Sequence, residues 1–492
     1  ELSRAERELS GDALRALAIT FFAGDGPASL EVAVERHGPA PYEARLYYAL
    51  GDLYVEKERF QDGAEAYRAF AQRQPLDPEA PLLIVRATDA YARGGFTTLV
   101  LDGKRQLVEQ YGPQSEFWRV NAPAIDPRVS LAVQQDLLVL AQHHHALAQK
   151  GSIADRDVAV RWYRDYLDGF DSSPQAPATR LLLADLLFEG ARYEEAAVEY
   201  QLAAYAYAAT PDSARAGYAA IVAFDKAEAQ AGESERATLR LRGVDAALRF
   251  ADAFPQNSET PAVLTRATRV LFDAGDRARA EAVAKQVLAL GARADAAQQL
   301  VAWTVLAHTY FDDARYADAE RAYAELVARL PVGDPQRAEA TERLAASVYR
   351  QAEAQQAAGD LSGAVQQFLR VAAVAPDSPS GAKAEYDAAA LLINAGRWNE
   401  AAGVLEGFRS RHPGHELEPQ VTRKLAAAYL EAGRQHDAAV ELERVSANTA
   451  ENAEVRRAVL WQAAELYAAT EDPASARRAY IGKVSALYFS GR

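Results

Sequence analysis

The 492-residue chain contains no cysteine and no methionine, and its apolar and basic residues form no long runs. The absence of cysteine excludes disulfides, thiolate catalysis and cysteine-ligated zinc. No apolar run approaches the ~18–20 residues of a membrane-spanning helix, so no membrane-spanning segment is predicted. The net charge is -15, and no Lys/Arg cluster supplies the basic stripe that phosphates require, which argues against binding to nucleic acid.

What the chain does contain is a repeated pattern of large and small residues. Residues three and four positions apart lie on one face of a helix, and each copy of the pattern has two such faces separated by a short turn. Two copies show the shared offsets most clearly: Tyr47, Leu50, Gly51, Tyr54, Phe60, Gly63, Tyr67, Phe70 and Pro75 in one, and Trp303, Leu306, Ala307, Tyr310, Tyr316, Ala319, Tyr323, Leu326 and Pro331 in the other.

Each copy therefore predicts a helical hairpin. A small residue early in the second helix, called the anchor here, lets the two helices approach closely, and a proline near its end stops that helix. The anchors are Gly63, Ala196, Ala319, Ala364, Ala401, Ala438 and Ala476.

This pattern resembles the tetratricopeptide repeat (TPR) family. Residues 303–331 match the family's W-x2-L-G/A-x2-Y, Y-x2-A-x3-Y and final P at every key position. The resemblance implies an all-α fold, a TPR-like α-solenoid in which antiparallel helix hairpins form a right-handed superhelix. Stacked repeats of this kind expose a long surface, and each repeat contacts only its neighbours.

The pattern also suggests how the chain is organised. We expect N-terminal capping helices in residues 1–40, a TPR-like array in 41–260 with an irregular insertion at 112–130, and a second TPR array in 261–492. Fainter hairpins are expected at 80–112, 126–170 and 212–255. Near the C-terminus, Gly482 is expected to interrupt the last helix, because glycine costs ~1 kcal/mol in a helix interior.

The linkers between repeats have a common style, in which a proline ends one helix and Asp or Ser precedes the next. Pro75-Leu-Asp-Pro and Pro376-Asp-Ser-Pro are examples. This style resembles the TPR proteins of the Gram-negative cell envelope, such as BamD-like outer-membrane assembly lipoproteins and Tol-Pal accessory proteins. The resemblance implies a periplasmic protein, outer-membrane associated, whose partners are envelope proteins.

The expected function is a non-catalytic scaffold or adaptor that supports assembly, export or organisation of an envelope complex. Two alternatives stay open: a helical domain of a larger polysaccharide-export or secretion protein, and a cytoplasmic TPR regulatory adaptor. Fold alone does not decide among them.

No catalytic motif accompanies the repeats. The chain has no phosphate-binding GxxxxGK[ST] loop, no HExxH and no GxSxG sequence. The run His143-His144-His145 is not expected to hold a metal, because adjacent helical residues point about 100° apart. We therefore expect no enzymatic activity, no cofactor and no metal site.

In the TPR family, residues of the first helix that lie off the core line a concave groove. Their mixture of aromatic, aliphatic and charged groups here suits an extended peptide or helix, or else the packing surface of a tight superhelix. The Lys and Asn carboxylate clamp of some TPR co-chaperones is absent. Carried over by position, the candidate groove residues are Arg45, Tyr48, Asp52, Val55, Leu181, Asp185, Phe188, Thr304, His308, Phe311, Gln420, Arg423 and Leu430.

Overall fold

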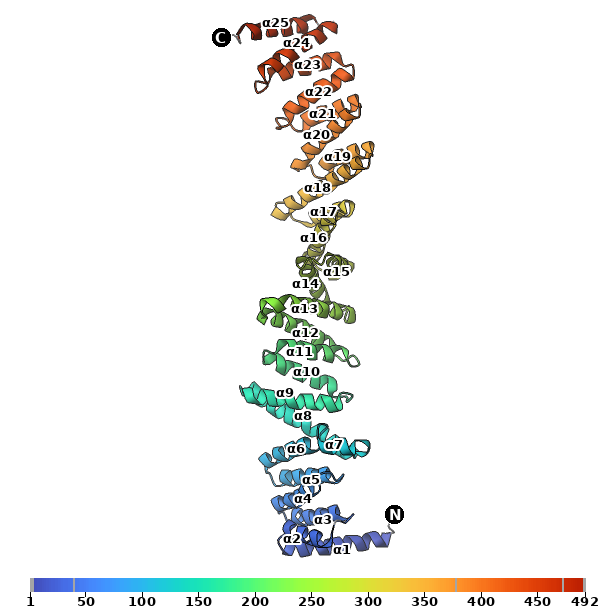
Figure 1. The fold of residues 1–492 in the computed structure, drawn as a ribbon, viewed down its shortest axis with the longest axis vertical. Helices are drawn as coiled ribbons and strands as arrows, with labels where there is room; N and C mark the ends of the chain where they lie inside the picture. Colours follow the sequence, from blue (N-terminus) through green and yellow to red (C-terminus); the bar gives the residue numbers. More distant parts are fainter. Residues whose placement is uncertain (1–3, 39, 377, 471–472, 490–492) are drawn as a thin grey trace. The chain divides into compact units, whose positions relative to one another are not determined.

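The computed structural model describes residues 4–38, 40–376, 378–470 and 473–489. In these ranges it contains 25 α-helices and two short 3₁₀ helices, with no strand (Figure 1). The predicted all-α fold is confirmed. Within the same ranges, no helix combines the length and the apolar character that crossing a membrane would require.

The chain folds as two compact units, residues 1–257 and 258–492. The helices of the first unit are α1 (Arg4–Ala23), α2 (Pro27–His37), α3 (Glu43–Glu56), α4 (Phe60–Arg73), α5 (Ala80–Arg93), α6 (Thr97–Tyr111), α7 (Glu116–Asn121), α8 (Pro127–Gln149), α9 (Ile153–Phe170), α10 (Ala176–Glu189), α11 (Tyr193–Tyr205), α12 (Ser213–Gln230) and α13 (Glu233–Ala253), with the 3₁₀ helix η1 (Ala122–Ala124) after α7.

The helices of the second unit are α14 (Thr260–Asp273), α15 (Arg277–Ala289), α16 (Ala296–Asp312), α17 (Tyr316–Arg329), α18 (Pro335–Ala357), α19 (Leu361–Val374), α20 (Pro379–Asn394), α21 (Trp398–Arg411), α22 (Glu418–Glu431), α23 (Gln435–Ala447), α24 (Ala453–Ala469) and α25 (Pro473–Phe489), with η2 (Gly291–Arg293) after α15.

From α3 onward the long helices form successive hairpins, and within each unit every hairpin packs against the next. We call the first helix of a hairpin the A helix (α3, α5, α8, α10, α12, α14, α16, α18, α20, α22 and α24) and the second the B helix. The hairpins expected at 80–112, 126–170 and 212–255 are confirmed as α5–α6, α8–α9 and α12–α13. The array of antiparallel hairpins is TPR-like.

Most turns between A and B helices depend on one residue with positive φ. In the α16–α17 turn Ala314 has φ 57°, and the amide of the next residue, Arg315, donates to the carbonyl of Tyr310 at 2.8 Å, which closes the end of the A helix in the manner of a Schellman cap. The matching positions are Glu58, Ala191, Gly95, Gly275, Gly359, Gly396 and Gly433. Glycine adopts this conformation without strain, whereas other residues do not.

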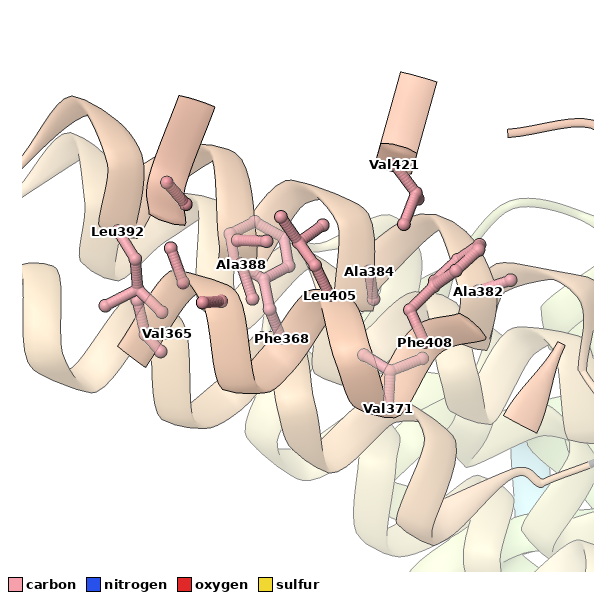
Figure 2. Packing of buried hydrophobic residues seen from close by; sticks show 14 of the residues in the cluster. Val365, Phe368, Val371, Ala382, Ala384, Ala388, Leu392, Leu405, Phe408 and Val421 are labelled. Carbon is pink, nitrogen blue, oxygen red and sulfur yellow. The ribbon is translucent and has the colours of Figure 1, made fainter. Parts of the chain in front are cut away.

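The core of each hairpin lies between its two helices and the next A helix, and the anchors are buried in it. Gly63 shows why an anchor must be small: a Cβ there would lie 2.8 Å from Val55 and 3.1 Å from the carbonyl oxygen of Gly51. Figure 2 shows this core around α19–α22, where Phe368, Leu405 and Phe408 are buried together. Burial of such apolar surface is the main stabilising contribution in each repeat.

The N-terminal helices differ from a repeat-type pair. Helix α1 packs along α3, whereas α2 makes only small contacts, with α1, α3 and α4 alike. The contact of α1 with α3 includes the rings of Phe22 and Tyr54, whose centroids are 4.9 Å apart. This arrangement places α1 over part of the first repeat.

Two irregular regions were expected from the sequence. In 112–130 the short helix α7 is held by Phe117 against Tyr111 and by Trp118 against Phe170, with ring centroids 5.1 Å and 6.0 Å apart. The interruption expected at Gly482 is wrong, because α25 continues through it. A Cβ at Gly482 would lie 3.3 Å from Leu460, so the glycine accommodates a close approach of α24.

Candidate protein-interaction face

The predicted groove residues come from equivalent positions of the A helices. Tyr48, Thr304 and Arg423 each stand 15 residues before an anchor (Gly63, Ala319 and Ala438). A helices of consecutive hairpins also contact each other directly, as in α14 with α16, α18 with α20 and α20 with α22. We call the surface that these helices present the A face.

In the first repeat, α1 covers part of the A face. A cavity of about 400 Å³ lies between α1 and α3 and is lined by Arg45, Tyr48 and Asp52. Arg45 donates to Ser10 of α1 at 3.2 Å, and the Tyr48 hydroxyl donates to Glu79 at 3.2 Å. The three predicted residues of α3 do lie together, and Arg45 and Tyr48 already have partners within the chain.

Two predicted carboxylates bind tyrosines of their own hairpin. The Tyr67 hydroxyl donates to Asp52 at 2.5 Å, and the Tyr200 hydroxyl donates to Asp185 at 2.6 Å. Burial raises the pKa of Tyr67, and the bond to Asp52 raises it further. These carboxylates therefore join the A and B helices, so they contribute to the packing of the hairpin.

The α16–α17 repeat has a different residue at this position. His308 takes the place of the aspartate, and its ring lies 5.8 Å from that of Tyr323 and 6.0 Å from that of Phe272. Burial and the nearby Arg343 lower the pKa of His308, which favours the neutral imidazole. The half-buried ring of His308 thereby extends an aromatic area on the A face.

The other predicted residues of the A face are two phenylalanines that pack on tyrosines and two polar side chains that bind neighbouring groups. Phe188 and Phe311 are half-buried, and each packs on the tyrosine that begins its B helix, with ring centroids 5.0 Å and 5.6 Å apart. The Thr304 hydroxyl donates to Leu300 of its own helix at 2.8 Å. Arg423 pairs with Glu451 at 2.8 Å.

Four other predicted residues complete this set. Gln420 and Leu430 of α22 are half-buried, whereas Val55 of α3 is buried. Leu181 of α10 is buried as well. Val55 and Leu181 therefore belong to the core.

Two aromatic residues of this face were not predicted from the sequence. Tyr349 and Tyr386 stand 15 residues before the anchors Ala364 and Ala401, the same offset that Tyr48 has from Gly63. Both are half-buried on A helices, and the Tyr349 hydroxyl donates to Asp387 at 2.6 Å. The shared offset would have identified them.

Three cations lie over aromatic rings of the same face, and each joins two consecutive A helices. Arg343 of α18 lies over Phe311 of α16, Lys383 of α20 over Tyr349 of α18, and Lys424 of α22 over Tyr386 of α20. Their charged groups are 5.3, 5.2 and 5.3 Å from the ring centroids. Such cation–π contacts contribute about 0.5–1 kcal/mol each at exposed sites.

Polar clusters elsewhere serve the helix packing. His144 pairs with Asp155 at 2.6 Å, and the buried His145 lies 3.1 Å from the Tyr163 hydroxyl and 3.3 Å from the Gln149 amide. These interactions account for two members of the histidine run. In the described part of the chain, no group of three potential ligands is arranged to hold a metal ion.

A second cavity, of about 590 Å³, lies where the linkers α21–α22 and α23–α24 approach each other. Arg409 and Arg444 line it, and both bind the buried carboxylate of Glu441, at 2.6 Å and 2.8 Å. A buried carboxylate requires such partners, so this arginine pair stabilises the junction between two hairpins.

The chain is a TPR-like helical-repeat protein. No protein-family model matches it, and no curated protein matches it. Solved structures similar to it include a Podosopora anserina putative kinesin light chain with nearly identical TPR-like repeats, at 22% identity over 39% of this chain and 97% of that one, with a TM-score of 0.22.

A second similar structure is the yeast Tom70, at 14% identity over 96% of this chain and 99% of that one, with a TM-score of 0.22. A third is a tetratricopeptide repeat protein from Parabacteroides merdae, at 14% identity over 54% of this chain and 92% of that one, with a TM-score of 0.23. At these scores the likenesses carry no argument about function. The repeat assignment rests on the anchors, turns and hairpins of this chain.

Proposed function

We propose that the chain is a non-catalytic scaffold that binds other proteins or peptides through its A face. The observation that carries this proposal is the set of half-exposed aromatic side chains on consecutive A helices, among them Phe311 of α16, Tyr349 of α18 and Tyr386 of α20. Partly exposed aromatic rings are the side chains that most often anchor protein partners.

The contacts of the A face favour binding over catalysis. Asp52 and Asp185 accept hydrogen bonds from tyrosines of their own hairpins, and such engaged carboxylates are poor general bases. A binding surface needs only shape, apolar area and charge, all of which the A helices provide.

We further propose that the partner belongs to a bacterial cell-envelope complex and that the chain works in the periplasm, associated with the outer membrane. The support is the proline and Asp/Ser style of the linkers. Ser378 illustrates it, since it stands two residues after Pro376 and its hydroxyl accepts from the amide of Ser380 at 3.1 Å, which caps α20. Fractionation of the source cells tests this placement: recovery with the periplasmic or outer-membrane fraction is expected, and recovery in the cytoplasm would contradict it.

The scaffold function is tested by affinity capture from source-cell extract with paired variants. Phe188→Ala and Phe311→Ala together are expected to reduce recovery of a specific protein at least about tenfold, because interface aromatics often contribute more than 1 kcal/mol each. The control combines Val198→Ala on the B helix α11 with Val332→Ala in a linker, two valines that are 41% and 92% exposed. Equal recovery with both double variants would contradict binding through the A face.

A further inference from the structure

The three cations over aromatic rings lie on consecutive A helices of the second unit. Together with their rings they make up what we call the cationic stripe: Phe311, Arg343, Tyr349, Lys383, Tyr386 and Lys424. Each cation–π contact joins one A helix to the next, so the stripe runs across α16, α18, α20 and α22.

These cations differ from most others of the same unit in having no acidic partner. Within the part of the chain that the structure describes, Arg343, Lys383 and Lys424 form no ion pair, although the protein carries a net charge of -15. By contrast, Arg315 pairs with Asp318 at 3.0 Å and Arg434 with Asp437 at 2.7 Å, both at A–B turns.

Three acids of this region already have partners. Asp387 accepts from Tyr349 at 2.6 Å, Glu342 accepts from Ser380 at 3.1 Å, and Glu451 pairs with Arg423 at 2.8 Å. Burial raises the pKa of Tyr323, Arg343 lowers it, and Asp312 and Glu339 raise it, so these two acids lie near Arg343, although neither forms an ion pair with it. The three cations are therefore open to an external anion.

A cation held over an aromatic ring is also well placed to bind an external anion. The ring supports one side of the charged group and limits its motion, while N–H donors on the other side stay available. Arg343 and Lys383 are exposed, and Lys424 is half-buried. An anionic group bound there would make a charge-assisted hydrogen bond beside an aromatic surface.

We propose that the cationic stripe binds an acidic polypeptide segment, in which carboxylates pair with Arg343, Lys383 and Lys424 and apolar side chains lie on Phe311, Tyr349 and Tyr386. This proposal rests on the scaffold function and names the chemistry of its partner. A polypeptide fits better than a nucleic acid, because phosphates recur about every 1.7 Å along duplex DNA and the -15 chain repels such a dense polyanion.

The test measures fluorescence anisotropy with the whole chain and three probes. The first is a labelled peptide of alternating glutamate and leucine, the second has glutamine in place of glutamate, and the third is a single-stranded oligodeoxynucleotide. The stripe variant combines Arg343→Gln, Lys383→Gln and Lys424→Gln. Its control combines Lys285→Gln, Arg321→Gln and Arg329→Gln on the B helices α15 and α17, which removes the same charge from side chains that are 56%, 79% and 36% exposed.

The glutamate peptide is expected to bind the unaltered chain and the control, and to bind the stripe variant at least about tenfold more weakly, as three exposed ion pairs together allow. Binding should weaken with added salt. Equal loss in both triple variants, equal binding of the glutamine peptide, or tighter binding of the oligonucleotide would overturn the proposal. Capture of a protein by the A face together with any of these results would leave the scaffold function in place and remove only the acidic partner.

Discussion

At the scale of single residues, the A–B turns show how similar positions tolerate different side chains. Every turn of the TPR-like kind described above needs one residue with positive φ, yet Glu58, Ala191 and Ala314 are not glycine. A residue with a Cβ costs about 1–2 kcal/mol in this conformation, which the packing of the two helices must offset.

We expect Ala314→Gly to stabilise the protein by about 0.5–1 kcal/mol. The backbone strain that glycine relieves in the folded state is larger, in free energy, than the stabilisation of the unfolded chain by glycine's greater conformational freedom. The matched change is Gly433→Ala at the same position of another turn, where φ is 73° and a Cβ would meet nothing within 4 Å. It should destabilise by a similar amount. Urea denaturation followed by circular dichroism measures both, and shifts of the same sign would contradict the strain explanation.

The buried His145 gives the protein a pH dependence. Burial lowers the pKa of His145, opposed by Glu189 and Asp185. The unfolded chain therefore binds more protons than the folded one as pH falls through the ordinary histidine value of about 6.5, and stability is lost in that range.

Replacement of His145 by glutamine should remove part of this loss. We expect the urea midpoint of His145→Gln to fall less between neutral pH and pH values below about 6 than that of the unaltered chain. His143→Gln is the control, since His143 is exposed. Parallel pH profiles for the unaltered chain and His145→Gln would show that this histidine does not contribute.

At the scale of helices, stability depends on how closely the A and B helices approach. Gly51 of α3 faces Tyr67 of α4, and a Cβ there would lie 2.3 Å from the tyrosine ring. The same tyrosine donates to Asp52, so a displaced ring would also lose its hydrogen bond.

Gly51→Ala is accordingly expected to destabilise the first unit by about 1–3 kcal/mol, as overpacking does. Gly243→Ala in α13 provides the comparison, because its Cβ would lie at an ordinary 3.4 Å from Phe224 and alanine is the better helix former. Thermal unfolding should show a loss for the first variant and none for the second. A neutral Gly51→Ala would mean that the hairpin adjusts without cost.

The core of α19–α22 allows a test of how far one repeat affects another. Phe408→Ala should cost about 3–5 kcal/mol, because Phe408 is fully buried. In a repeat protein the damage spreads mainly to neighbouring repeats, so amide hydrogen exchange should rise in α20–α23 and stay unchanged in α3–α6. A uniform rise along the chain would contradict this local coupling.

Particular residues show what the sequence could predict at this scale. The anchors and the prolines were sufficient to predict the hairpins, since spacing and residue size determine how two helices pack. The sequence could not show that α1 lies along α3, because that contact joins segments outside the repeat pattern. It also missed Arg343, Lys383 and Lys424, since each lies over a ring of the preceding hairpin and their offsets from the anchors differ.

At the scale of the whole molecule, we propose that partners bind at the A face. Half-exposed aromatic rings, carboxylates engaged by tyrosines and the cationic stripe all lie on A helices. The B helices carry cations as well, but those of α15 and α17 chosen as controls pair with acids of their own helices.

The measurement that tests this claim most directly is site-specific photo-crosslinking in the source cells. A photoreactive residue replaces Phe311 or Tyr386 on the A face, or Arg321 on the B helix α17, which is 79% exposed. We expect a discrete crosslinked protein from the two A-face positions and none from Arg321, with the crosslinked segment rich in Asp and Glu. Crosslinks of equal yield from Arg321, or none from the A face, would contradict the central claim.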